Sequence, residues 1–170
     1  MAGYTQLDEI VDYSHKIINK IILSPDVMRL IANTSDYDPN SDDAERWEAH
    51  VNDRNWIEDT IQAPGAYILV DAELTKAPTG SIKNMTVSIQ VVCEKSFMQL
   101  TNDIFPGIKG NRRDNICRQT DLLINGSRDF GIGRLNLVSA TLASAPEGFT
   151  SRVLTYEVPD FARDRARFPR

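Results

Sequence analysis

The chain has 170 residues, of which 41% are hydrophobic and 25% are charged, and its formal net charge is -5. This length suits a single globular domain with one hydrophobic core and leaves little room for two domains. No apolar run approaches the roughly 18 residues that a membrane span requires, and the acidic start MAGYTQLDEIVDY lacks the basic and then apolar pattern of a secretory signal, so we expect a soluble protein that folds in the cytoplasm.

The charge is spread unevenly along the chain. Residues 33–60 hold nine acidic side chains and two arginines, a net charge of -7, so the remainder of the chain carries +2. At the other end, residues 161–170 (FARDRARFPR) hold four arginines and one aspartate. Such asymmetry is typical of contacts between protein surfaces, and a basic tail also suits nucleic acid or an acidic neighbour.

Two helices are predicted at the start of the chain. The first has an apolar stripe at three- and four-residue spacing, with charged residues facing outward. A shorter second helix follows, with Ser24 as N-cap and Pro25 at its first position. Its apolar face is formed by Val27, Leu30 and Ile31, and the stripe of the first helix by Leu7, Ile10, Val11, Ile17, Ile18, Ile21 and Ile22.

The acidic segment 33–63 is predicted to be a long surface loop with a helical turn around DDAERWEAHV. Its two tryptophans, Trp47 and Trp56, have two interpretations. They anchor the loop to its own domain, which we favour, or they anchor a neighbouring protein.

Four strands and a third helix are predicted after this loop. The stretches AYILVDAEL and NMTVSIQVVCE read as an antiparallel strand pair, and GRLNLVSAT and SRVLTYEVPDF read as a second pair. Between the pairs, RRDNICRQTDLLING is predicted to be a helix that Gly126 ends. The inward faces are formed by Met85, Val87, Ile89, Val91 and Cys93 on the second strand and by Ile116, Thr120, Leu123 and Ile124 on the helix.

The glycine-rich stretch INGSRDFGIGRLNL (124–137) is close to a phosphate-binding loop in composition but not in context. A phosphate loop runs from a strand into a helix, because the free amides at the helix N-terminus hold the phosphate. Here the order is reversed, and Arg134 and Leu135 follow the last glycine in place of a lysine and a hydroxyl residue. The stretch therefore predicts a helix end and the entry to a strand, with no nucleotide site.

Few residues offer catalytic chemistry. Cys93 and Cys117 are far apart in sequence and are interpreted as two buried thiols. His15 lies beside the stripe of the first helix, and His50 lies among the acids of the loop without the spacing of a metal motif. No G-x-S-x-G occurs. We therefore predict no catalytic residue, no cofactor and no metal ligand, and regard an enzyme as the minority interpretation.

Together the elements predict an α/β (α+β) fold with a mixed or largely antiparallel sheet and helices packed on one face. We expect one domain over residues 1–160, which includes the long acidic loop 33–63. Residues 161–170 would form a basic, extended C-terminal tail.

The order of elements resembles the small neck proteins of tailed bacteriophages, most of all tail terminators and next head-tail adaptor and stopper proteins. The resemblance rests on the leading helices VDYSHKIINKIILSPDVMRLIANT, the segment RRDNICRQTDLLINGSRDFGIGRLNLVSAT and the final GFTSRVLTYEVPDF. It is a pattern that covers most of residues 1–161 and no strict motif. The acidic segment 33–60 and the arginine tail are less typical of the family.

The resemblance implies a compact α/β domain that assembles as a ring, commonly a hexamer. Such a ring caps the tail tube and joins it to the head connector, so the implied partners are further copies, the tail tube protein and a connector, adaptor or stopper protein. The protein would be a structural virion component assembled in the host cytoplasm. DNA would pass through the lumen without specific binding, which an acidic protein suits because phosphate contacts would hold the strand.

Within this interpretation three segments hold candidate contact residues. The loop DIFPGIKGNRR is expected to expose apolar residues beside cations, and the tail is expected either to order on a partner or to stay disordered. The candidates are Phe105, Ile108, Arg112 and Arg113 in the loop, Trp47 and Trp56 in the acidic segment, and Arg163, Arg165, Arg167 and Phe168 in the tail.

Two other classes of function are open at this point. One is a small cytoplasmic metal-dependent enzyme that uses the acidic loop around His50. The other is a monomeric regulatory module that binds partners through the tryptophan-bearing loop.

Overall fold

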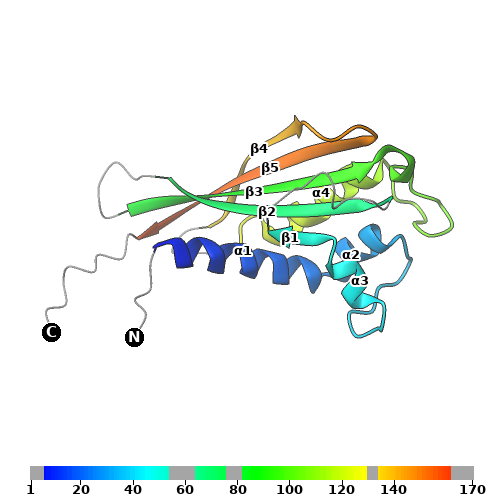
Figure 1. Ribbon diagram of the computed structural model, residues 1–170, viewed down its shortest axis with the longest axis horizontal. Coiled ribbons are helices and arrows are strands. Elements are labelled where there is room, and N and C mark those ends of the chain that lie inside the picture. The colour runs from blue at the N-terminus through cyan, green and yellow to red at the C-terminus, as the bar shows by residue number, and fades with distance from the viewer. Residues whose placement is uncertain (1–5, 54–63, 76–81, 130–133, 162–170) are drawn as a thin grey trace, which may run out of the picture.

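A computed structural model describes residues 6–53, 64–75, 82–129 and 134–161 of the chain (Figure 1). Its five strands form one open mixed sheet in the order β1-β2-β3-β5-β4, and the helices cover one face of this sheet (Figure 1). This confirms the predicted fold class. The strands are β1 (Val51–Asp53), β2 (Ala66–Thr75), β3 (Ile82–Glu94), β4 (Asn136–Ala143) and β5 (Phe149–Phe161), and the helices are α1 (Gln6–Ile22), α2 (Pro25–Ala32), α3 (Ala44–Glu48), the short 3-10 turn η2 (Lys95–Phe97) and α4 (Arg112–Ile124).

Helix α1 lies across β1 and β2 with one face inward. Ile17 and Ile21 are fully buried, as the spacing of the apolar residues predicts. Val11 was expected on the same stripe, but it is 51% exposed, and Tyr13 is buried in its neighbourhood instead. The apolar stripe of this helix is therefore narrower than the sequence suggests. Within the described residues, no helix is long and apolar enough to cross a membrane.

Helix α2 begins and ends where its boundary residues predict. Pro25 occupies the first turn, where its fixed φ suits a helix and its missing N–H is not needed. Ser24 holds the N-cap position, although its side chain makes no capping hydrogen bond. Asn33 ends the helix in the left-handed conformation at φ 58°, and its N–H bonds to the carbonyl of Arg29.

The acidic segment is more ordered than a surface loop. It contains α3 and then β1, which pairs in parallel with β2 through Val51 and Ile68. Val51 and Ala44 are both buried. Helix α3 confirms the predicted helical turn around DDAERWEAHV, whereas the prediction of a loop is wrong for β1 (Val51–Asp53), because a short apolar contact returns the chain to the sheet edge.

The central strands form a long antiparallel layer. Strand β2 pairs with β3 from Ala66 opposite Cys93 to Thr75 opposite Asn84, which confirms the predicted strand pair. Strand β5 lies between β3 and β4 and is antiparallel to both. The predicted inward face of β3 is buried as expected, from Met85 to Cys93 at every second residue.

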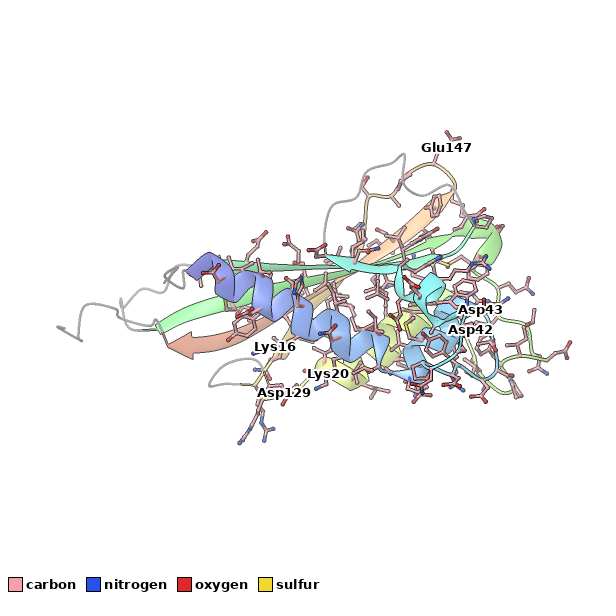
Figure 2. The ribbon with its side chains drawn as sticks, turned by 60° about the horizontal axis from the view of Figure 1, so that its bottom comes forward. Lys16, Lys20, Asp42, Asp43, Asp129 and Glu147 are labelled. Carbon is pink, nitrogen blue, oxygen red and sulfur yellow. The ribbon has the colours of Figure 1, made fainter. Side chains whose placement is uncertain are left out.

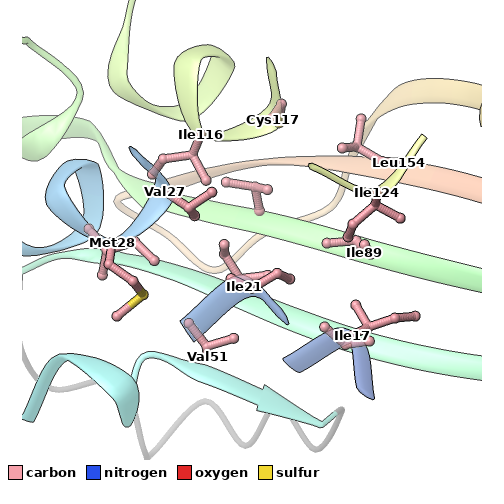
Figure 3. Close-up of a cluster of buried hydrophobic side chains, with 14 of the residues drawn as sticks. Ile17, Ile21, Val27, Met28, Val51, Ile89, Ile116, Cys117, Ile124 and Leu154 are labelled. Atoms are coloured by element: carbon pink, nitrogen blue, oxygen red, sulfur yellow. The ribbon is translucent and has the colours of Figure 1, made fainter. Parts of the chain in front are cut away.

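Helix α4 packs on β3 and β5 and closes the core. Asn111 caps it by accepting a hydrogen bond from the N–H of Asp114. Ile116, Thr120 and Ile124 are fully buried, as predicted, and Gly126 follows the helix at φ 78°. Figure 3 shows the core where these residues meet α1, α2 and the sheet: Ile17, Ile21, Val27, Met28, Val51, Ile89, Ile116, Cys117, Ile124 and Leu154.

Candidate assembly surfaces

In the loop predicted to contact a partner, Phe105, Arg112 and Arg113 are part of the interior. Phe105 is 2% exposed, Arg112 is 1% exposed and Arg113 is 7% exposed, while Ile108 is partly buried against the core. The expectation that this loop exposes apolar residues beside cations is therefore wrong. The prediction that these residues contact another subunit assumed that their side chains are exposed, and the burial of Phe105, Arg112 and Arg113 removes that support.

Arg112 is the centre of this buried region. Its Nε donates to the carbonyl of Phe97 at 2.7 Å, and its Nη1 donates to the carbonyl of Leu30 at 2.6 Å. Its Nη2 donates to Oδ1 of Asn33 at 2.6 Å and to the carbonyl of Gln99 at 3.3 Å. Burial lowers the pKa of this guanidinium. Arg112 thus ties the end of α2 and the 97–99 segment to α4.

Two aromatic rings complete the surroundings of Arg112. The guanidinium carbon lies 4.1 Å from the ring centroid of Phe97 and 5.4 Å from that of Phe105. Neutral carbonyls and ring faces therefore satisfy the charge, and in the described part of the chain no carboxylate pairs with it. This is the arrangement of a structural tie between segments.

Arg113 belongs to a second, partly exposed network. It donates to the hydroxyl of Thr150 and to Asp114, and Nε of Arg152 lies 3.2 Å from the same carboxylate. Burial acts to raise the pKa of Asp114, but hydrogen bonds from Asn111 and Arg113 and the nearby arginine charges lower it overall. The network joins the N-terminus of α4 to β5.

His50 lies in an aromatic cluster at the β1 edge. Its ring stacks on Tyr67 at 4.4 Å between centroids, and its Nδ1 lies 3.0 Å from the carbonyl of Ala66. Burial lowers its pKa. Within the described residues, no group of three or more His, Cys, Asp or Glu side chains is arranged to hold a metal ion. The ring of His50 is therefore engaged in packing the acidic segment onto the sheet.

Of the two tryptophans and the tail candidates, the structure describes Trp47 alone. Trp47 packs against the core and lies 5.4 Å from His50 between ring centroids, which fits an anchor to its own domain. Trp56 and the tail candidates lie outside the described residues, the latter being Arg163, Arg165, Arg167 and Phe168. The cysteines Cys93 and Cys117 are buried and free, as predicted.

Two groups of the charged side chains labelled in Figure 2 lie apart from each other. Asp42 and Asp43 lie together just before α3, and Lys16 and Lys20 lie on α1 near Asp129 (Figure 2). Lys20 pairs with Asp129 at 2.7 Å. The acidic residues before α3 thus form a charged end of the molecule, away from the lysines of α1.

Among the described residues, an exposed apolar surface lies at β4, one edge of the sheet. Val138 and Leu142 on this strand are 57% and 69% exposed, and Leu122 on the neighbouring α4 is 67% exposed. The strand sequence NLVSATLA contains no charged residue and no proline. Soluble proteins place charged residues or prolines on exposed strand edges, because an open edge pairs with other chains. The unprotected edge of β4 is therefore a candidate assembly surface.

A groove runs between α4 and this edge strand. It has a volume of about 320 Å³ and is lined by Asp114, Cys117, Arg118, Asp121, Leu137, Ala140, Arg152 and Leu154. Its carboxylates are engaged from within the chain, since Arg113 donates to Asp114 and the hydroxyl of Tyr156 donates to Asp121 at 3.1 Å. The groove thus adds an apolar floor beside the open edge. This surface was not predicted from the sequence; the uncharged stretch NLVSATLA is the sequence signal that could have identified it.

Comparison with known proteins adds a family and a fold. A family model described as YomW matches residues 24–158. Among solved structures, one chain of the "Virion of native gene transfer agent (GTA) particle" aligns at a TM-score of 0.51 with 11% sequence identity, over 86% of this chain and 92% of that chain. No curated protein sequence matches. At this identity the likeness concerns the fold.

Proposed function

The chain belongs to the YomW family, and from this premise we propose that it is a structural protein of a phage-type virion that acts as a tail terminator. In this role it forms a ring that caps the tail tube, joins the tube to the head connector and lets DNA pass. The observation that carries the proposal is the fold shared with a chain of a gene transfer agent virion over nearly the whole length of both chains.

The open edge of β4 supports an assembling role. Each copy in a ring needs two different surfaces, because a heterologous contact repeated around an axis closes a ring. The uncharged strand β4, with its exposed Val138 and Leu142, supplies one surface of this kind. Such an apolar patch beside a groove is typical of a protein contact.

The charge of the chain suits a channel for DNA. Lys and Arg contacts to phosphates bind nucleic acid strongly and would slow a strand that must pass. The formal net charge of -5 and the exposed acids near α3, such as Asp42 and Asp43, oppose such contacts. A ring of acidic subunits therefore guides DNA without holding it.

Light scattering and electron microscopy test this proposal. The mass of the purified chain is measured alone and after addition of assembled tail tubes, and the mixture is imaged by negative stain. Rings, alone or at tube ends, support the terminator role. Rings that bind the head connector and ignore tubes would instead show an adaptor or stopper, and a monomer that binds neither would refute a neck role.

The metal-dependent enzyme receives no support from the arrangement of His50. Its ring is stacked on Tyr67 and bonded to a backbone carbonyl, so it is not presented to a substrate. The regulatory module loses one of its anchors in the same way, because Trp47 packs against the core. We therefore place both below the structural role.

A further inference from the structure

We propose that the open edge of β4 binds residues 162–170 of a second copy of this chain, added to the sheet as a sixth strand. The inference rests on the proposed ring and names the contact that would close it. Its acceptor is the uncharged strand β4 with the α4 groove, and its donor is the basic segment that follows β5. This is strand addition, in which backbone hydrogen bonds give affinity and side-chain pockets give register.

The acceptor strand β4 presents apolar side chains on the face of the sheet that carries the groove. Ala140 lies opposite Leu154 and Leu142 lies opposite Arg152 in the β4–β5 register, so both point to the α4 side of the sheet. Leu142 remains exposed there. An added strand would cover this side chain and pair with the backbone of the edge.

The donor segment matches this edge in length and pattern. Strand β4 has 8 residues, and the nine residues 162–170 would span about 30 Å when extended. They alternate, with Ala162, Asp164, Ala166 and Phe168 on one side and Arg163, Arg165 and Arg167 on the other. In a strand this places the alanines, Asp164 and the phenylalanine over the groove and the three arginines on the opposite face.

The direction of β5 favours a second copy over the same chain. Strand β4 begins at Asn136, opposite Glu157, and beyond this pair β5 continues to Phe161 with β3 alone as its partner. Strand β5 therefore ends past the start of β4, and at its end it points away from the groove (Figure 1). Reaching its own edge would require a reversal and a crossing over β4, whereas a neighbour needs neither.

Charge also favours a contact between copies. Residues 162–170 carry a formal charge of +3, so the rest of the chain carries -8 within the total of -5. Acidic bodies repel one another when they are packed in a ring. A basic segment laid on the neighbouring body reduces this repulsion, and the contact should weaken as salt screens the charges.

Disulfide trapping between full-length chains tests the proposal. One chain carries Ala140→Cys and a differently tagged chain carries Ala166→Cys, and they are mixed under mild oxidation, alone and with tail tubes. Both chains also carry Cys117→Ala, because Cys117 lines the groove beside Ala140, whereas Cys93 is fully buried and does not compete. We expect a mixed disulfide that carries both tags. Adding Leu142→Lys to the acceptor chain should lower its yield about tenfold, because a charge blocks the edge.

Two controls test whether the disulfide is specific to a contact between copies: a chain with Leu23→Cys, and a chain that carries both Ala140→Cys and Ala166→Cys. Leu23→Cys replaces Ala140→Cys on another exposed residue away from the edge, since Leu23 is 69% exposed. Equal trapping at Leu23, no trapping, or a disulfide found only within one doubly substituted chain would each overturn the inference. Rings that form without this disulfide would overturn it while the terminator role stands. The specific disulfide without any ring would support the contact and refute the terminator role.

Discussion

Replacing Arg112 with alanine should destabilise the fold severely. The guanidinium donates short hydrogen bonds to the carbonyls of Phe97 and Leu30 and to Oδ1 of Asn33, and each acceptor would lose its donor. A buried polar group left without a partner costs about 1–3 kcal/mol, so three of them cost about 3–5 kcal/mol when partial hydration is allowed for. Since domains are stable by about 5–15 kcal/mol, this change would remove a large share of the stability.

Arg112→Lys is the more informative variant. It keeps the positive charge, but its donors radiate from one nitrogen and cannot reach acceptors on α2, on the 97–99 segment and at Asn33 together. We expect a loss of about 2 kcal/mol. Urea unfolding, followed by tryptophan fluorescence and far-UV circular dichroism, measures both variants. Arg118→Ala, an exposed arginine on the same helix, is the matched control and should change stability by less than about 0.5 kcal/mol.

The result that would refute this reasoning is a small effect. If Arg112→Ala lowered the unfolding free energy by less than about 1 kcal/mol at an unchanged urea dependence, the acceptors would be satisfied without the guanidinium. If Arg112→Lys were as stable as the parent chain, charge alone would suffice. In either case Arg112 would not be the tie between the segments.

Three further predictions follow from single positions. Burial, assisted by Arg46, lowers the pKa of His50 from its ordinary 6.5, so its contribution to stability is present above about pH 6.5 and is lost as pH falls through the folded value. His50→Gln should remove this part of the pH dependence in urea unfolding, while the exposed His15→Gln should retain it. Burial raises the pKa of Cys93 to about 11 and that of Cys117 to about 12, so a thiol reagent at about pH 8 should label neither in the folded chain and both in urea. Gly126→Ala should lower thermal stability by about 1 kcal/mol through backbone strain at φ 78° alone, because no atom lies within 4 Å of the added Cβ; an unchanged midpoint would show that the helix end relaxes.

The sequence predicted the elements whose side chains repeat with a clear period. The alternation in β3 and the spacing of Ile116, Thr120 and Ile124 in α4 each identify an element and its buried face, because burial of one face imposes that period. The second strand pair, GRLNLVSAT and SRVLTYEVPDF, was predicted from the turn SAPEGFT between them, and β4 and β5 confirm it. These patterns are local, so a single sequence displays them.

The features that were missed depend on contacts between distant segments. Strand β1 has only 3 residues, too few to show alternation, and its partner β2 lies beyond residues 54–63. Arg112 and Arg113 read as surface residues because arginine is seldom buried. One physical signal did exist: two cations at a helix N-terminus oppose the helix dipole, so their placement requires acceptors elsewhere. The irregular 97–99 segment and the end of α2 supply the acceptors of Arg112, and Asp114 and Thr150 supply those of Arg113.

The position of β5 determines how the molecule would carry mechanical load. Strands β3 and β5 are each 13 residues long and pair over their full length, and β4 holds the other side of β5. A pull along the strand at Phe161 acts at right angles to the interstrand hydrogen bonds, so many bonds share the force at once. A pull that peels β4 from the edge would break them pair by pair. Tension entering through the end of β5 would thus run through the middle of the sheet and leave the packing of α1 and α2 outside its path.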